Sequence, residues 1–394
     1  MKGAGAVVVM AAGGLVWRAH DQGVFAGENG PAFEPWRTWH GDAAEGPLAL
    51  VRAAILAANP HNTQPWLFRL DGPRVELYAD SARNLWAFDP YLREMHIGLG
   101  CAVENMARAA GALGYEAAVT LAPGALGAAP AAASSDPPRA AAVATLDLSP
   151  ARARPDVLFE AIPRRHTNRG PYDPSRPVPP EVIAAMWVAF QDDADVRLFL
   201  FSASEERRRF GAAVVGATEA IVADGQMVDD SQRWFRHRRA DVERLRDGPT
   251  LDAAGLSPLM TAMAKMLPPS SPETSHRYWL DATRDVHVAT SPLFGLIAVR
   301  DLYDRPQALR AGRRWQRLHL LATAQGLAMQ PINQPVELVD RQRQQQRAPA
   351  AARVLAELTG DPTWLPTFAF RVGFAARGAP PSPRRPVDAV VLRG

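Results

Sequence analysis

One short loop gathers the polar side chains best suited to hold a flat heterocycle. It reads Asn59-Pro60-His61-Asn62-Thr63-Gln64-Pro65-Trp66 and lies between an expected helix and an expected strand. Its two prolines restrict the backbone, and the amides of Asn62 and Gln64 can each donate and accept hydrogen bonds. This pattern indicates recognition of a ring with alternating carbonyl groups and ring nitrogens. The alternative is a helix-terminating loop whose amides cap the backbone.

Two arginine clusters could bind an anionic group. The first is Arg164-Arg165-His166-Thr167-Asn168-Arg169, and the second is Arg384-Arg385 near the C-terminus. Arginine binds phosphate and carboxylate groups bidentately, which lysine does not. The chain has 44 lysine and arginine residues, of which only Lys2 and Lys265 are lysine, so we attribute most of the surplus to the codon bias of a GC-rich genome. The alternative for each cluster is an arginine-rich turn.

A further amide-bearing loop follows an expected helix C-terminus. It runs from Gly326 to Pro335 and contains Gln330, Pro331, Ile332, Asn333 and Gln334. Its prolines fix the backbone as in the first loop.

In this order, the four segments resemble the nitroreductase family of flavoproteins, and more narrowly its Acg-type branch of FMN-binding oxidoreductases. The resemblance covers about residue 47 to the C-terminus. It implies FMN as cofactor, NAD(P)H as electron donor, and a flat small-molecule acceptor such as a nitroaromatic or a quinone. No catalytic residue is required, although His61 could donate a proton near the ring; the alternative is an ordinary loop histidine.

The resemblance also assigns cofactor-binding residues. His166 stands where the family usually has a hydroxyl residue. For the ring we expect Asn62, Thr63, Gln64 and Trp66, and for the phosphate end Arg164, Arg165, His166, Asn168, Arg384 and Arg385. The loop after the helix is expected to add the cofactor-binding residues Gln330, Pro331, Ile332 and Gln334.

The order of the motifs predicts an unusual architecture. In ordinary family members the arginine segment precedes the Asn/Gln loop, and two subunits share two flavin sites. Here the Asn/Gln loop comes first, about 100 residues earlier, and neither motif recurs. We therefore expect an α+β fold with mixed sheets flanked by helices, made of two degenerate repeats fused in one chain (46–150 and 151–394). The expected result is one FMN per chain and a monomer or weak homo-oligomer.

Residues 204–280 are a long insertion for this fold and could form a lid over the flavin. A lid that stays shut would give the alternative function, a protein that binds or sequesters FMN with little turnover. Met260, Met263 and Met266 within it are spaced as packing residues.

Hydrophobic periodicity predicts the elements that must position these motifs. Residues 18–45 are expected to form an extended arm on the core. Helices are expected over 47–58, 92–114, 181–191, 204–246 and 308–326, and strands over 67–70, 75–78, 196–201, 291–299 and 368–374.

Composition excludes several classes of protein. Hydrophobic residues make up 47% and charged residues 22%, as in soluble globular proteins. The single cysteine, Cys101, excludes an intramolecular disulfide and a CxxC metal site, so no metal is expected. Acidic residues number 41 against 44 basic ones and are well mixed with them, which argues against nucleic-acid binding.

The first 17 residues differ from the rest of the chain in their lack of charged side chains after Lys2. Gly3 to Trp17 carry no charge, but they fall short of the roughly 20 residues that span a bilayer. They match the apolar core of an export signal, similar to a twin-arginine signal whose arginine pair is absent. We expect membrane attachment or export through residues 3–17; a buried or frayed N-terminal helix in a cytoplasmic protein is the alternative.

Overall fold

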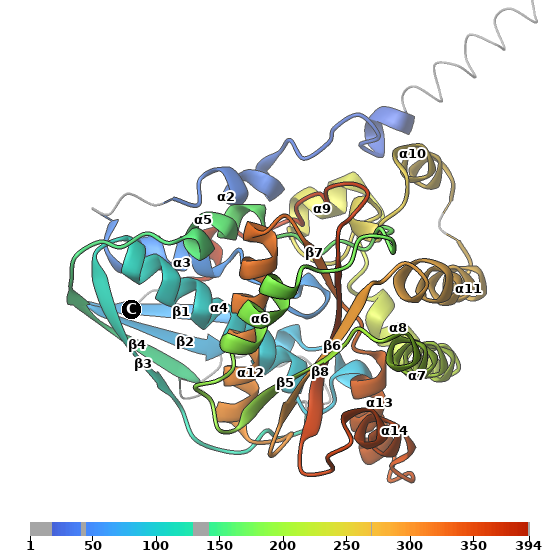
Figure 1. The fold of residues 1–394 in the computed structure, drawn as a ribbon. Helices are drawn as coiled ribbons and strands as arrows, with labels where there is room; N and C mark the ends of the chain where they lie inside the picture. The colour runs from blue at the N-terminus through green and yellow to red at the C-terminus, as the bar shows by residue number, and fades with distance from the viewer. Residues whose placement is uncertain (1–17, 41–44, 129–141, 269, 393–394) are drawn as a thin grey trace, which may run out of the picture.

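The chain folds into two four-stranded sheets that enclose a pair of long helices (Figure 1). The computed structural model describes residues 18–40, 45–128, 142–268 and 270–392, so the predicted signal or anchor at 1–17 lies outside the described residues. All pairs of named strands are antiparallel, rather than mixed as expected.

The first half forms one sheet with the strand order β1-β2-β4-β3. Its strands β1 and β2 are joined by the turn at Gly72, whose φ of 55° suits glycine. The elements are α3 (Pro47–Ala54), β1 (Trp66–Asp71), β2 (Arg74–Ala79), α4 (Arg93–Ala112), β3 (Tyr115–Leu121) and β4 (Ala144–Pro150).

The second half forms the other sheet with the order β5-β6-β8-β7. Strand β6 is buried along its whole length, which explains its uninterrupted apolar sequence. The core elements are α5 (Val157–Ala161), α6 (Pro180–Val188), β5 (Val196–Phe201), β6 (Leu293–Val299), α12 (Arg305–Ala324), β7 (Ala328–Pro331) and β8 (Leu365–Gly373).

The two halves share one topology. In each, a helix precedes two strands, a 20-residue helix follows, and two more strands complete a sheet of order first-second-fourth-third. The halves differ in what is inserted. The β5–β6 connection carries α7 (Ser204–Val222), α8 (Gly225–Gln232), α9 (Arg239–Leu245), α10 (Pro258–Met266) and α11 (Pro272–Asp281), and the β7–β8 connection carries α13 (Gln334–Gln344) and α14 (Ala350–Thr359).

The two long helices, α4 and α12, cross where Gly100 meets Gly312. A Cβ atom at Gly100 would clash with the main-chain oxygen of Leu309, and one at Gly312 would clash with that of Ile97. Glycine is therefore required at both positions for the backbones to approach this closely. One continuous core, which includes Leu99, Val103 and Trp315 from these helices, joins both sheets.

The predicted lid, residues 204–280, begins with a helix that packs on the second sheet. Helix α7 packs Phe210 and Val214 against Phe294 and Leu296 of β6, with α13 and α14 beside it, so it covers the outer face of the second sheet. The continuous helix expected over 204–246 is wrong, because Asp224 caps a new helix at α8 and α9 begins only at Arg239.

The N-terminal arm lies on the core, as its aromatic residues suggested. Residues 31–37 are helical, in a 3-10 turn and α2 (Glu34–Arg37), rather than extended, and Trp36 and Trp39 are buried. Within the described ranges, no helix has both the length and the hydropathy needed to cross a membrane. The same residues contain no group of three or more acidic, histidine or cysteine side chains placed to hold a metal ion.

Candidate functional site

Two buried arginines from distant parts of the chain meet at the end of α3. Arg165 follows α5, Arg384 lies in the C-terminal tail, and each is 2% exposed. Arg165 Nη2 donates to the Leu56 oxygen over 3.0 Å, and Arg384 Nη2 donates to the same oxygen over 3.4 Å and to that of Ala57 over 3.2 Å. Arg384 Nη1 also donates to the Asn62 side chain.

Neither guanidinium has a carboxylate partner among the described residues. Nε and Nη1 of Arg165 and Nε of Arg384 are buried without any hydrogen-bond partner there. Burial lowers the pKa of Arg165 to about 10, and burial together with Arg165 lowers the pKa of Arg384 well below its usual value. Two buried cations with free donors form a site for an anion.

Two histidines lie beside this pair. Burial lowers the pKa of His166 to about 3, with Arg165 and Arg384 adding to the shift. His319, on α12, is shifted in the same direction by burial and by Arg165. Nδ1 of His166 and both ring nitrogens of His319 are buried without a partner among the described residues. The site thus offers neutral imidazoles beside two guanidinium groups, a donor set that fits a phosphate group.

The arm covers this pair of arginines. The Trp36 indole lies edge-on to His166 at 4.6 Å between ring centroids, and the Arg384 guanidinium lies 5.0 Å from the Trp36 ring. Trp36 Nε1 donates to the Ser382 oxygen over 2.7 Å, which ties the arm to the tail. The arm therefore shields the arginine pair from water on this side.

Two expected members of the arginine clusters do not reach the pair. Arg164 is exposed and donates to the Glu160 oxygen, because the 3-10 turn over Ile162–Arg164 directs it away from the buried side. Arg385 donates to the oxygens of Gln64 and Ala389, because consecutive side chains of an extended backbone point in opposite directions. Of the four arginines assigned to the phosphate, Arg165 and Arg384 are therefore the two that are buried together.

The Asn/Gln loop is strained and its amides are engaged. His61, Asn62 and Gln64 have φ values of 45°, 51° and 52°, a region that non-glycine residues rarely occupy. Asn62 Nδ2 donates to Pro383 O over 2.9 Å and to Gly248 O over 3.3 Å. The assignment of Asn62 and Gln64 to a heterocycle stays a prediction, since here they join three segments of the chain.

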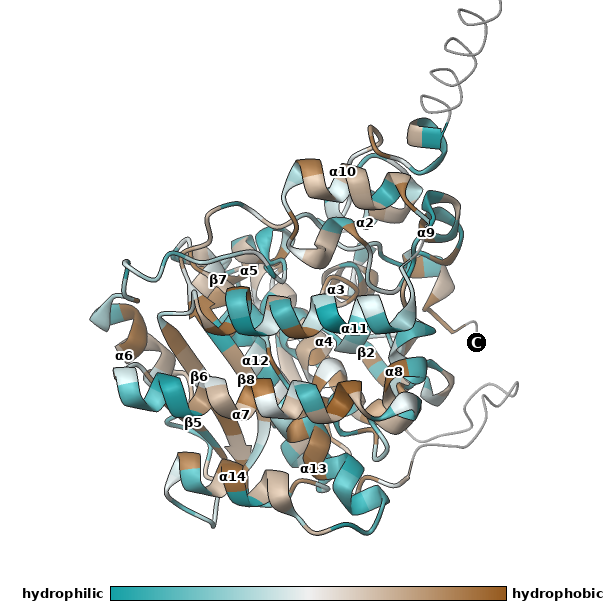
Figure 2. Cartoon of the chain, turned by 90° about the vertical axis from the view of Figure 1, so that its right-hand side faces the viewer, coloured by the Kyte–Doolittle hydropathy of each residue, from teal (hydrophilic) through white to brown (hydrophobic). Residues whose placement is uncertain are grey.

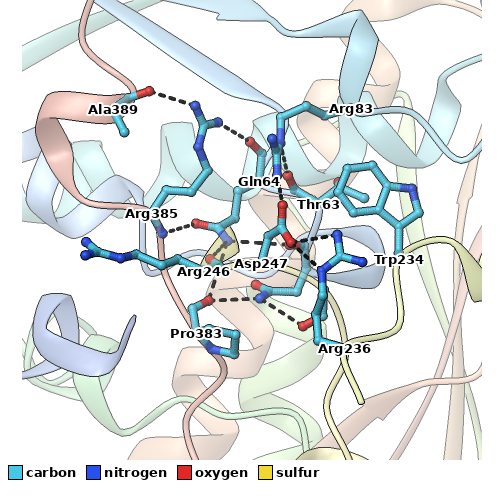
Figure 3. A network of polar contacts seen from close by, with 12 residues as sticks. Thr63, Gln64, Arg83, Trp234, Arg236, Arg246, Asp247, Pro383, Arg385 and Ala389 are labelled. Atoms are coloured by element: carbon cyan, nitrogen blue, oxygen red, sulfur yellow. Dashed lines mark hydrogen bonds and ion pairs between the residues drawn. The ribbon is translucent and has the colours of Figure 1, made fainter. Parts of the chain in front are cut away.

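Figure 3 shows this junction of loop, insertion and tail. Gln64 Nε2 donates to Arg246 O over 2.8 Å, and Gln64 Oε1 accepts from Arg385 N over 2.8 Å. Asp247 lies between Arg83, with which it forms an ion pair, and Arg236 at 2.8 Å. The insertion is thereby attached to the loop that precedes β1.

His61 faces the insertion. Its Nε2 lies 2.9 Å from Ser231 Oγ, and its ring stands edge-on to Phe88 at 5.2 Å. Burial, with a contribution from Arg169, lowers its pKa to about 4. The imidazole is therefore neutral near neutral pH. Thr63 Oγ1 and Trp66 Nε1 in the same loop are buried without a partner among the described residues.

The remaining candidates lie at the second sheet. Asn168 Nδ2 donates to Arg377 O over 2.7 Å, and Gln330 Oε1 accepts from Arg371 Nε over 2.7 Å. Pro331 pairs with Phe370 in the sheet, and Ile332 belongs to the core beneath α7. Gln334 Oε1 is buried and unpartnered within the described ranges.

Sequence reasoning missed Trp36, His319 and Asp247. Trp36 lies outside every motif, His319 is one polar residue within an apolar helix, and Asp247 directly follows the expected helix 204–246 and belongs to no motif. The one sequence signal for His319 is a histidine among the apolar residues of an expected helix.

Comparisons with known proteins give a family. Two proteins of Mycobacterium tuberculosis, strains CDC 1551 and H37Rv, each named "Putative NAD(P)H nitroreductase", are 30% identical to this chain over 360 residues, which is 89% of this chain and 92% of theirs. No family model matches the sequence. Among solved structures, the FMN-dependent nitroreductase NfnB of Mycobacterium smegmatis, in complex with NADPH, has a TM-score of 0.38 and 15% identity, and the match covers 60% of this chain and 98% of that one. A NfnB from a Sphingopyxis strain has a TM-score of 0.38 and 17% identity, and the match again covers 60% of this chain and 98% of that one. At 30% identity over nearly the whole length of its relatives, the chain belongs to the nitroreductase superfamily.

Proposed function

We propose that the protein is an FMN-dependent oxidoreductase that uses NAD(P)H and reduces a flat acceptor such as a nitroaromatic or a quinone. The observation that carries the proposal is the pair Arg165 and Arg384, buried together without a carboxylate partner among the described residues. An anion of the size of a phosphate would neutralise both and satisfy their free N–H groups.

The residues of this chain would bind and shield the cofactor. Arg165, Arg384, His166 and His319 would hold the phosphate of FMN. When bound, FMN supplies the redox chemistry by accepting a hydride and passing electrons to the acceptor. His61 would keep one ring proton beside Ser231 Oγ as a neutral imidazole, because its pKa is lowered to about 4. The junction of Asn62, Gln64 and residues 246–248 would exclude water from the ring end.

A stoichiometry of one FMN per chain follows from the unequal halves. In the shared topology, α6 corresponds to α3, and its terminal Ala189 oxygen also accepts from a buried arginine, Arg314, over 2.7 Å. There, however, Arg314 pairs with Asp192 at 2.8 Å and Arg310 pairs with Asp195 at 2.7 Å. These carboxylates pair with the arginines of the second half, whereas Arg165 and Arg384 have no carboxylate partner among the described residues. This supports the fused pseudo-dimer with a single surviving site.

A second function, FMN sequestration with little turnover, has its own supporting observation. The insertion is bonded to the Asn/Gln loop at Gly248 N–Asn62 O, 3.1 Å, as well as through the side chains of Gln64 and Asp247. A cover held in this way would have to open for NAD(P)H to reach the ring.

The absorbance spectrum of the purified protein tests the proposal. We expect a flavin spectrum with one flavin per chain, which bleaches rapidly when NADPH is added anaerobically. A persistent yellow colour would favour sequestration over reduction. Protein that neither carries flavin nor binds added FMN would refute both functions.

A further inference from the structure

The outward face of α10 is apolar, although it is exposed. Leu259 is 70% exposed, Met260 55%, Met263 56% and Leu267 62%. Met260 and Met263, whose spacing is typical of packing residues, are thus not packed in the core. Soluble proteins rarely leave such a contiguous apolar stripe uncovered unless something binds it.

The inner face of the same helix is polar and attached to the protein. Lys265 Nζ lies 2.7 Å from Asp252 Oδ1 and donates to the Gly23 oxygen over 3.2 Å. Thr261 and Ala262 line a cleft of about 300 Å³ that also includes Arg169. The helix is therefore attached to the protein through Lys265, while its largest apolar side chains point outward, unlike those of an ordinary surface helix.

The start of the described chain contacts the same helix. Phe25, 78% exposed, lies two residues after Gly23, whose oxygen contacts Lys265. Arg18 Nε donates to the oxygen of Met266, the last residue of α10, over 2.8 Å. The chain thus enters the described structure at the end of α10, directly after the fifteen uncharged residues Gly3–Trp17. Figure 2 places α10 beside this end of the chain and far from α14.

We propose that α10, with Phe25, docks on a lipid bilayer surface. We commit to lipid because the uncharged sequence Gly3–Trp17 directly precedes Arg18, which is bonded to the end of this helix. Side chains of leucine, methionine and phenylalanine would insert at the boundary between headgroups and acyl chains, as in interfacial helices. This inference does not depend on flavin binding.

The test is co-flotation of the full chain with vesicles of equal parts phosphatidylcholine and phosphatidylglycerol. The double substitution Leu259→Glu/Met263→Glu should lower the bound fraction by about tenfold or more, since it places two charges in the interface. A matched control is Val188→Glu/Val354→Glu, which alters exposed valines on α6 and α14 and should float like the parent. Equal flotation of the two double variants would overturn the proposal. A parent that is dimeric in solution and becomes monomeric only on the α10 substitution would also overturn it, because the face would then bind a second copy.

A label at one site avoids any effect on folding. The natural cysteine, Cys101, is buried, so Met260→Cys provides one accessible thiol for an environment-sensitive fluorophore. We expect a blue shift of its emission when vesicles are added, and none for Val354→Cys. An unchanged emission at position 260 contradicts docking.

Discussion

Arg165 and Arg384 donate to the same main-chain oxygen, that of Leu56, from positions more than 200 residues apart in the chain. A shared acceptor places two like charges side by side in the interior. That arrangement is unfavourable unless an anion binds between them. The stability of the flavin-free protein therefore distinguishes arginines that bind an anion from arginines that only support the fold.

Replacing Arg165 should therefore stabilise the flavin-free protein. Arg165→Met removes a buried charge, while Arg384 still satisfies the Leu56 oxygen. We expect the free energy of unfolding of the flavin-free protein to rise by about 1–3 kcal/mol, measured by denaturant titration. Arg164→Met, at an exposed position, is the control and should change it by less than about 0.5 kcal/mol. A marked loss of stability in Arg165→Met would identify a structural arginine.

The ion-pair junction at Asp247 should control the release of bound flavin. Asp247→Asn removes the charge that pairs with Arg83 and Arg236, a loss of about 1.5–3 kcal/mol for the junction. We expect flavin to dissociate roughly ten times faster, as measured by fluorescence recovery on dilution. Asp241→Asn breaks only the exposed pair with Arg244 and should leave the rate unchanged. Identical rates for the two variants would mean that the insertion does not limit access.

The crossing of α4 and α12 should tolerate no side chain. Gly100→Ala would drive a methyl group into the Leu309 oxygen, and we expect a loss of about 1–3 kcal/mol or more in unfolding free energy. Gly111→Ala, in the same helix with open space around it, should instead gain up to about 1 kcal/mol. Equal effects at both positions would show that the helices do not cross here.

The pH dependence of stability should reflect a buried acidic group at the start of α4. Burial, with Asp89 adding, raises the pKa of Glu94 to about 8, against the opposing effects of Arg93 and Asn333. The folded state then keeps a proton that the unfolded state has lost, so stability falls as pH rises towards about 8, by up to roughly 1.4 kcal/mol per pH unit. Above that value this contribution stops changing.

Glu94→Gln should reduce this slope between about pH 7 and pH 8, while Glu337, whose pKa is raised well above its usual value by burial and by Glu94, keeps its own contribution. The buried histidines of lowered pKa, such as His61 and His166, contribute equally in parent and variant, so the difference between their slopes reports on position 94. Asn333 Nδ2 can still donate to the amide oxygen at position 94, as it does to Glu94 over 2.8 Å. Glu116→Gln, at an exposed position, is the control and should show the same change of stability with pH as the parent. An unaltered slope in Glu94→Gln would place the proton elsewhere.

Periodicity predicted most of the core. Helices α3, α4, α6 and α12 and strands β1, β2, β5, β6 and β8 lie within a few residues of their expected bounds. The short strand β7 was missed because four residues do not show an alternating pattern. Helices α8 and α9 were merged with α7 because the caps that separate them, such as Asp224, are ordinary polar residues until their hydrogen bonds are seen.

The site was predicted less completely than the fold. The motif pattern found Arg165 and Arg384, but it could not tell them from Arg164 and Arg385, because burial is decided by the turn and by the extended tail. His319 and Trp36 reach the site from a helix and an arm that carry no motif. Such residues are brought together only by tertiary packing, which one sequence does not reveal.

The central claim, that Arg165 and Arg384 bind the phosphate of FMN, is tested most directly by comparing FMN with riboflavin, which lacks that phosphate. In fluorescence titrations, the flavin-free protein should bind one FMN per chain and prefer it to riboflavin by about ten- to a hundredfold, the value of one or two charge-assisted contacts. Arg165→Met should lose most of this preference by weakening FMN alone. Equal affinities of the parent for the two flavins, or two FMN per chain, would contradict the account.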